Sequence, residues 1–284
     1  MGSRSRRADN PDMTASTLRA ADLIALHRSS TDGSLELLYQ PEIDLQTGAI
    51  VAMEGLLRWH HGKSGLMGPR EFLDMAENSG EIAPIGRWVL DAGAAEAARW
   101  QGIGPTPRQL FLNVSASQLA APTFLDEITE ILHRHELPRG VLGLEITEGA
   151  ITMLGGRALP LLAELRSAGL VLAVDDFGTW YSTLGALEEL PIHAVKLDQR
   201  YVRGVGGDIE DDTIVASVIS LAHARGLYVV AEGVESWAES ARLTELGCDR
   251  AHGFLFAGPQ RADKARWMLA QAQGWRPGTA QPEE

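Results

Sequence analysis

The sequence predicts an α/β fold, a (β/α)8 TIM-like barrel with an antiparallel first strand. Eight short apolar runs alternate with longer amphipathic stretches from about residue 35 onward. Such alternation is typical of a parallel sheet whose strands are joined by crossover helices. The runs are almost continuously apolar, which indicates that both faces of the sheet are buried. A doubly wound open sheet is the alternative, but eight buried strands in one domain favour a closed barrel.

The predicted strands are these apolar runs, and the predicted helices lie between them. The strands span 35–45, 49–59, 109–115, 142–147, 170–177, 194–198, 228–234 and 250–256. Only Gln46-Thr47-Gly48 separates the first two, which is too short for a crossover, so these two strands should form an antiparallel hairpin. The helices span 69–78, 84–101, 116–135, 157–168, 209–225, 237–246 and 261–272. The long connection between the second and third strands therefore holds two helices.

Composition excludes several classes of protein. The formal charge of −13 argues against binding to nucleic acid polymers, which relies on surplus Lys and Arg. A single cysteine, Cys248, excludes an internal disulfide and fits the cytoplasm. No apolar run approaches the roughly 18 residues of a membrane span, so no membrane contact is expected. We expect one domain over 18–272, a disordered lead-in over 1–17 and a disordered tail over 273–284.

Polar residues recur at the C-terminal ends of the predicted strands. Four of them lie on four different strands, each embedded in apolar sequence: Glu54, Asn113, Glu145 and Asp175. A single carboxylate at a strand end is usually a helix cap or a solvated loop residue. Several carboxylates that converge on one barrel rim are costly without cations, and that rim is where such barrels build active sites. Oxygen ligands of this kind suit Mg²⁺ or Mn²⁺.

Asp175 and Asp176 are adjacent at the end of one predicted strand. Neighbouring residues of a strand point to opposite faces, but both can turn toward the rim where the strand bends into a loop. One acid could then bridge two cations while the other binds the second. Two hard cations a few ångströms apart suit in-line displacement at a phosphodiester. Helix capping is the alternative for Asp176 and Glu148.

Lys196 lies in the C-terminal part of the next predicted strand, 194–198. A lysine at this position can position or deprotonate the attacking water, or offset the negative charge of the acids. The alternative is a structural ion pair with Asp198 or Glu232. A barrel lyase that uses Lys196 for a Schiff base is a more remote alternative, but it does not explain the Asn and the acids.

Six ordered motifs carry a resemblance to a known family. "YQPEIDLQTGAIVAMEGLLRW", "NVSASQL", "LEITE", "DDFGTWYSTL", "LPIHAVKLD" and "VVAEGVE" resemble the EAL-domain family, the cyclic di-GMP phosphodiesterases. The resemblance covers residues 18–272. It implies a (β/α)8 barrel with an antiparallel first strand and hydrolysis of cyclic di-GMP to linear pGpG with two Mg²⁺ or Mn²⁺ ions. It also implies a homodimer.

The resemblance assigns a role to each matching residue. The implied metal ligands are Glu54, Asn113, Glu145, Asp175 and Asp176. Lys196 and Glu232 are implied to orient or activate the attacking water, and Glu148 to anchor the loop after Asp176. The implied substrate contacts are Gln40, Arg58, Asp198, Glu235 and His252. Arg58 matches a phosphate contact, with an exposed surface arginine as the alternative.

The sequence departs from the family pattern at a few positions. Gly55 replaces an Ala, Trp180 replaces a Gly, and His252 stands where Gln is usual. Trp180 is expected either to cover the dimer contact or pocket mouth, or to pack on the neighbouring helix. A second function therefore stays open: a cyclic di-GMP-binding effector with weak or no catalysis. Its output would pass through the loop around Trp180 to an unidentified protein partner.

Overall fold

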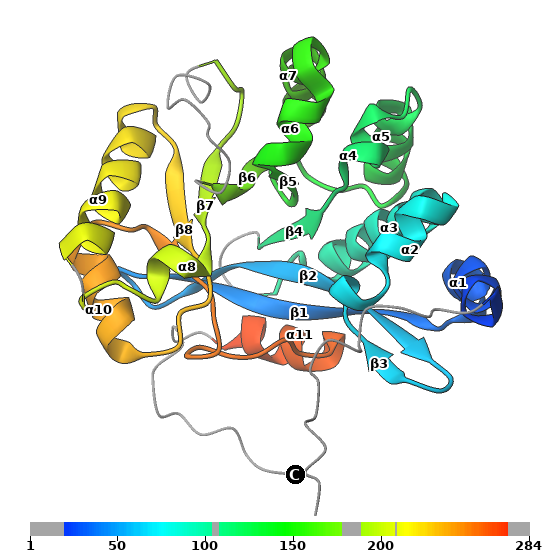
Figure 1. Cartoon of the computed structure of the whole chain (residues 1–284), viewed down its shortest axis with the longest axis horizontal. Coiled ribbons are helices and arrows are strands. Elements are labelled where there is room, and N and C mark those ends of the chain that lie inside the picture. Colours follow the sequence, from blue (N-terminus) through cyan, green and yellow to red (C-terminus); the bar gives the residue numbers. More distant parts are fainter. Residues whose placement is uncertain (1–19, 104–107, 178–188, 208, 272–284) are drawn as a thin grey trace, which may run out of the picture.

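The protein folds into a closed barrel of eight strands. The computed structural model describes residues 20–103, 108–177, 189–207 and 209–271. The strand order is β1-β9-β8-β7-β6-β5-β4-β2, and pairing of β1 with β2 closes the barrel (Figure 1). The barrel strands are β1 (Leu35–Asp44), β2 (Ile50–His61), β4 (Gln109–Asn113), β5 (Leu142–Thr147), β6 (Val171–Phe177), β7 (Ala194–Leu197), β8 (Tyr228–Ala231) and β9 (Arg250–Ala251). The predicted barrel is confirmed.

The first strand is antiparallel to both of its neighbours, as the short connection predicts. β1 pairs with β2 from Leu35 opposite Trp59 to Ile43 opposite Ile50, and it pairs antiparallel with β9. Asp44 organises the turn, because its Oδ1 accepts hydrogen bonds from the backbone and side chain of Thr47. The remaining neighbouring pairs of the barrel are parallel.

Helices surround the strands (Figure 1). They are α1 (Ala20–Asp32), α2 (Leu73–Ser79), α3 (Ile82–Trp100), α4 (Ala116–Ala120), α5 (Phe124–Arg134), α6 (Glu148–Leu154), α7 (Ala158–Ala168), α8 (Gln199–Val202), α9 (Ile209–Ala224), α10 (Trp237–Glu245) and α11 (Ala262–Ala270). Short 3₁₀ turns are η1 (Pro69–Glu71) and η2 (Gly155–Arg157). The expected pair of helices between the second and third barrel strands is α2 and α3. Among the described residues, no helix combines the length and the apolar character that a membrane crossing needs.

Several predicted boundaries are wrong. The helix predicted over 116–135 is two helices, because Pro122 cannot donate the helical hydrogen bond and clashes with the preceding turn. The strand predicted over 228–234 ends at Ala231, and Gly233 then adopts a positive φ of 66°. The strand predicted over 250–256 ends at Ala251 and continues as a turn. The structure also adds a hairpin strand, β3 (Gly65–Met67), and the unpredicted helices α1, α6 and α8.

The interior of the barrel is packed around one aromatic ring. Phe111 forms a separate buried cluster with Ala52, Val171, Ala173 and Ala194, all of which are small or short side chains from other strands. Gly143 lies beside Phe111 in the β4–β5 register. A Cβ atom built on Gly143 would lie 2.4 Å from the Phe111 ring. A phenyl ring fits inside the barrel because its neighbours there are this small.

Gly143→Ala should therefore destabilise the protein. The added methyl meets a rigid ring in a packed interior, and we expect the free energy of unfolding to fall by roughly 1–3 kcal/mol. Urea denaturation followed by circular dichroism measures this change. The control is Gly156→Ala, since a Cβ at Gly156 meets no atom within 4 Å. Equal stability of the two variants would contradict the packing argument.

Candidate active site

The side chains of the candidate site form the next interior layer of the barrel, toward the C-terminal ends of the parallel strands. Residues of a strand alternate between the inside and the outside of a barrel, so the residue two positions further along also points inside. Each candidate site residue stands two positions after a residue of the interior layer on its own strand. The interior positions are 52, 111, 143, 173, 194, 230 and 250, and the residues two positions further along are Glu54, Asn113, Glu145, Asp175, Lys196, Glu232 and His252. The polar residues that the sequence places at separate strand ends therefore converge at one end of the barrel.

Lys196 lies at the centre of this group and is only 2% exposed. Its Nζ is 2.6 Å from Glu232 Oε1, 2.8 Å from Glu145 Oε1 and 3.2 Å from Glu54 Oε2. Burial lowers the pKa of Lys196, but these carboxylates outweigh it and raise the pKa well above its ordinary value. Lys196 is therefore an ammonium. On sequence alone, an ion pair between Lys196 and Glu232 is an alternative role for this lysine. That ion pair is present, and it is one of three ion pairs that Lys196 makes with carboxylates.

The carboxylates around Lys196 are more numerous than the single positive charge that its ammonium supplies. Burial, with Glu54 next in importance, raises the pKa of Glu145 well above its ordinary value. Burial raises the pKa of Asp175 to about 7, with further contributions from Glu232 and Glu54. Burial also raises the pKa of Glu54, but the ammonium of Lys196 and the positive charge of protonated His252 reverse this and lower it. One ammonium does not neutralise the group, so further cations would stabilise the ionised acids.

The free ligand atoms of the group fit a hard divalent cation. Glu145 Oε2 is buried and has no hydrogen-bond partner among the described residues. Glu54 Oε1 accepts a hydrogen bond of 2.9 Å from Asn113 Nδ2, so these two side chains from neighbouring strands are already in contact. Glu54, Glu232 and His252 each offer one ligand atom, and these atoms all lie within 4.8 Å of one another. Carboxylate and amide oxygens are the usual ligands of Mg²⁺ and Mn²⁺.

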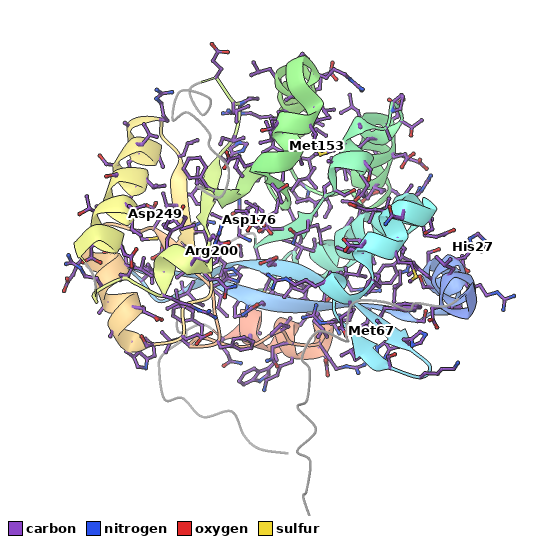
Figure 2. The ribbon with its side chains drawn as sticks, viewed as in Figure 1. His27, Met67, Met153, Asp176, Arg200 and Asp249 are labelled. Carbon is purple, nitrogen blue, oxygen red and sulfur yellow. The ribbon has the colours of Figure 1, made fainter. Side chains whose placement is uncertain are left out.

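A local irregularity of β6 brings the two adjacent acids to the rim. The register of β6 with β7 shifts between Val174 and Phe177, and Asp176 has a positive φ of 56°. This conformation is uncommon for a residue other than glycine. The Asp176 N–H donates to Asp175 Oδ1 at 2.8 Å, which stabilises the bend. Asp176 lies in the middle of the molecule, among side chains of the barrel (Figure 2). The bend expected from the adjacent acids is therefore present.

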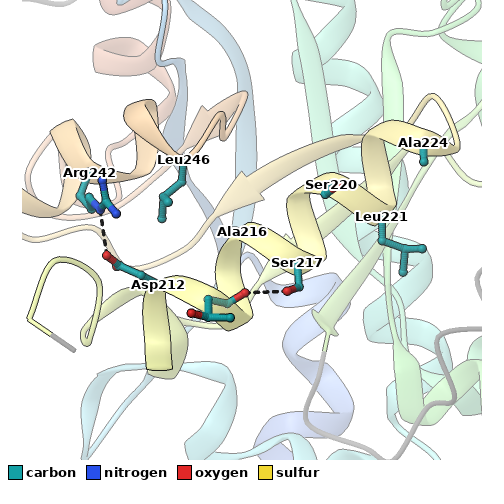
Figure 3. A pocket seen from close by; sticks show the side chains of 9 residues that line it. Asp212, Ala216, Ser217, Ser220, Leu221, Ala224, Arg242 and Leu246 are labelled. Carbon is teal, nitrogen blue, oxygen red and sulfur yellow. Dashed lines mark hydrogen bonds and ion pairs between the residues drawn. The ribbon is translucent and has the colours of Figure 1, made fainter. Parts of the chain in front are cut away.

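A cavity of about 990 Å³ opens beside these acids. Its lining includes Glu54, Asn113, Asp175 and Asp176 together with Arg58. A second hollow, of about 820 Å³, lies between α9 and α10, where Asp212 pairs with Arg242 (Figure 3). None of the carboxylates around Lys196 lines that second hollow. The first cavity is therefore the candidate substrate pocket.

The other residues that the resemblance implies are only partly brought together. Gln40 is buried opposite Glu54 in the β1–β2 register, and its Nε2 donates to the Ala257 carbonyl at 3.0 Å. Arg58 is half-buried in the cavity wall, where its Nη1 donates to the Leu57 carbonyl. This placement argues against the alternative of an exposed surface arginine.

Three implied residues lie at the edge of the group or away from it. Asp198 caps α8 and pairs with Arg200 at 2.9 Å, but it also contributes to raising the pKa of Asp176, after burial and Glu232. Glu148 is buried at the first turn of α6. Its implied partner, the loop after Asp176, falls largely outside the described residues, as does Trp180. The Glu235 side chain is 55% exposed and lies 3.8 Å from Arg203, away from the acids.

Two cavity residues have no motif that could have identified them. Arg70 lines the cavity and belongs to η1, directly after Pro69. Met153 lines it from α6 and is 80% exposed (Figure 2). In the sequence neither belongs to a motif, and Met153 lies in a stretch for which no helix is predicted. Only the packing of η1 and α6 around the barrel mouth places them beside the acids.

The chain is similar to proteins that are named for cyclic di-GMP chemistry. It is 36% identical to the bifunctional diguanylate cyclase/cyclic di-GMP phosphodiesterase MucR of Pseudomonas aeruginosa, over 81% of this chain and 34% of MucR. It is 35% identical to the cyclic di-GMP phosphodiesterase PdeR of Escherichia coli, over 84% of this chain and 36% of PdeR. The chain thus spans about a third of the length of these curated relatives.

A solved structure and a family model agree with these similarities. The structure of the PaMucR phosphodiesterase in complex with c-di-GMP has a TM-score of 0.81 to this protein and is 35% identical. The superposition covers 86% of this chain and 99% of that one. The model of the EAL domain matches residues 24–259. The chain therefore belongs to the EAL domain family.

Proposed function

We propose that this chain hydrolyses cyclic di-GMP to linear pGpG. The observation that supports the proposal most strongly is the convergence of Glu54, Asn113, Glu145, Asp175 and Asp176 around a buried lysine beside a large cavity. MucR and PdeR are named as cyclic di-GMP phosphodiesterases, and the PaMucR structure contains c-di-GMP. In the reaction, water adds to one phosphorus atom and the P–O3′ bond breaks. The products are a 3′-hydroxyl and a 5′-phosphate on one linear dinucleotide.

The proposed cofactor is a pair of Mg²⁺ or Mn²⁺ ions. Glu54, Asn113, Glu145 and Asp175 would hold the first ion, and Asp175 with Asp176 the second. Two such ions would stabilise negative charge on the phosphoryl oxygens and make water a better nucleophile. The bend at Asp176 supports a shared ligand set, because it lets two neighbouring acids line the same cavity.

Glu232 and Lys196 are proposed to orient the attacking water. Burial raises the pKa of Glu232, but Lys196 and His252 outweigh burial and hold the pKa far below its ordinary value. A carboxylate with a lowered pKa stays ionised, so it can accept a hydrogen bond from water but retains a proton poorly. Glu232 is therefore suited to aligning the water, and the Lys196 ammonium to balancing the charge that develops at the phosphate.

The substrate contacts are proposed from the cavity wall outward. Arg58, which lines the cavity, is proposed to bind a phosphate, since a guanidinium can donate two parallel hydrogen bonds to phosphate oxygens. The remaining proposed contacts are Gln40, Asp198, Glu235 and His252. Glu235 has the least support, because its side chain is exposed, faces Arg203 and does not line the cavity. A cytoplasmic location is proposed from the single, buried Cys248, as expected in a reducing compartment.

Removal of metal should abolish the activity. With Mn²⁺ we expect pGpG to accumulate, and with excess EDTA we expect none, because the ligand oxygens alone cannot stabilise the charge of the transition state. Chromatography of the nucleotides measures this. Glu54→Gln removes one anionic ligand and should lower the turnover at least about a hundredfold. Glu164→Gln, on the exposed face of α7, is the matched control. Full turnover in EDTA would refute the metal proposal, and tight binding without pGpG would favour the effector function.

Lys196→Met should impair the chemical step far more than substrate binding. The side chain keeps its length but loses its charge, and we expect the single-turnover rate constant to fall about a hundredfold. The concentration of cyclic di-GMP that gives half-saturation should change little, because Lys196 does not itself line the cavity. Single-turnover kinetics separate the two effects. The exposed Lys63→Met serves as the control. If affinity falls while the rate constant is unchanged, Lys196 binds substrate instead.

The protein is proposed to be a homodimer, on the family resemblance. The implied contact follows Asp176 and includes Trp180, which lies outside the described residues. Light scattering should give twice the monomer mass, and Trp180→Gly should change the turnover or its dependence on protein concentration. A monomer with full activity at all accessible concentrations would exclude a required dimer. An unchanged Trp180→Gly variant would indicate packing alone.

A further inference from the structure

We propose that His252 is a nitrogen ligand of the metal site and makes this site prefer Mn²⁺ to Mg²⁺. The inference rests on the proposed function, since it concerns the cations of the same site. It differs from the role implied by sequence, in which His252 contacts substrate. The observations that carry it are the position of His252 beside two carboxylates and the state of its two ring nitrogens.

The imidazole of His252 lies among candidate ligand atoms. Its Nε2 is 3.3 Å from Glu232 Oε1, and its Nδ1 is 3.7 Å from Glu54 Oε2. A ligand atom from each of these three residues lies within 4.8 Å of the other two. This spacing requires only a small contraction around a divalent cation. His252 is the nitrogen donor of the group, while the carboxylates supply oxygen.

The ring nitrogens of His252 are buried, and neither makes a hydrogen bond of good geometry, although Nε2 faces Glu232 Oε1 as an ion pair at 3.3 Å. The backbone on both sides is fixed, because the His252 N–H donates to Ala231 and the His252 carbonyl accepts from Val234. Nδ1 lies 3.7 Å from Glu54 Oε2, beyond hydrogen-bond distance, and a buried nitrogen in this state costs free energy and calls for an explanation. A cation explains it. One nitrogen would bind the cation, and the other would face a carboxylate, as is usual for histidine ligands.

A second buried atom points to a cation at the same group. Glu145 is 2% exposed, its Oε1 pairs with Lys196, and its Oε2 has no partner. The Lys196 ammonium already contacts Glu54 Oε2 and Glu232 Oε1. A carboxylate has two oxygens and about four acceptor positions, so each of these acids can bind both the ammonium and a cation. The lysine and the metal would then share the acids without displacing one another.

The identity of the donor determines the metal preference. Mg²⁺ strongly favours oxygen ligands in octahedral geometry, whereas imidazole suits transition metals better. An all-oxygen group would bind the two ions more equally. With His252 as a ligand, the ratio of Mn²⁺ to Mg²⁺ affinity rises, and so the metal supply would set the activity of the protein.

The experiment uses the Mn²⁺-loaded wild-type protein without nucleotide. Pulsed EPR should show coupling of the Mn²⁺ electron spin to a histidine nitrogen, and labelling histidine with ¹⁵N should change that coupling. In His252→Gln the coupling should vanish, and calorimetry should show Mn²⁺ affinity reduced about tenfold or more with Mg²⁺ affinity within about threefold of wild type. His223→Gln should keep the coupling, because His223 pairs with Asp249 at the opposite end of β9.

Each outcome decides the inference. Absence of histidine coupling in the wild-type protein overturns it, whether or not the variant folds. If Mn²⁺ binds and pGpG forms but no histidine coupling is seen, only the role of His252 is wrong. If Mn²⁺ neither binds nor supports hydrolysis, the proposed function fails as well. Coupling that persists in His252→Gln assigns the nitrogen to another histidine and also overturns the inference.

Discussion

The ammonium of Lys196, buried among carboxylates, is the interaction on which the site depends. Three acids from three strands contact it directly, at 2.6 to 3.2 Å. Without a cation at this position, their mutual repulsion and their burial would favour protonation or separation of the strands. The lysine thus keeps the acids in place, but distance to it does not set their pKa values. Glu145 lies 2.8 Å from Lys196 and has a raised pKa, because burial and Glu54 outweigh the ammonium, whereas Glu54 lies at 3.2 Å and has a lowered pKa. Asp175, which has no direct contact with Lys196 among the described residues, has a pKa raised to about 7.

The layer beneath the acids makes this arrangement possible. Phe111 fills the barrel because Ala52, Ala173, Ala194 and Gly143 leave room for its ring. Two residues further along the same strands, the interior positions are polar. A packed apolar layer below excludes water from that side, so electrostatic interactions among the acids are stronger than they would be at a surface. One layer of interior side chains is thus apolar and packed, and the next layer along the strands holds the charged residues of the site.

Metal ligation and charge balance are connected at Glu54 and Glu232. Both contact Lys196, and both lie beside His252. Glu54 also accepts from Asn113, which lines the substrate cavity. A change in the cation bound near His252 would therefore act on Glu232 and on Glu54, which lines the cavity. Metal identity and turnover would be coupled through these two side chains rather than through a movement of the fold.

The sequence by itself determined the eight barrel strands, the helices other than α1, α6 and α8, and the residues at the strand ends. Apolar runs and turn residues are local properties, so the barrel, its reversed first strand and the bend at Asp175-Asp176 could be predicted. The six motifs were also sufficient to indicate the EAL family, which the comparison confirmed. Local pattern was less informative about where elements end. The hydrophobic periodicity continues through Pro122, but the predicted helix is interrupted there. The apolar pattern also continues past β8 and β9, but both strands end before the glycines that follow them.

Only the tertiary structure decided which side chains meet. Glu54 and His252 are far apart in the sequence, and they become neighbours because β1, between β2 and β9, closes the barrel. The same closure gives Lys196 three partners instead of one. It also leaves Glu235 outside the group, although its motif matches as well as that of Glu232. Periodicity reports the face of one strand, whereas contacts across a barrel depend on the register and stagger of all eight.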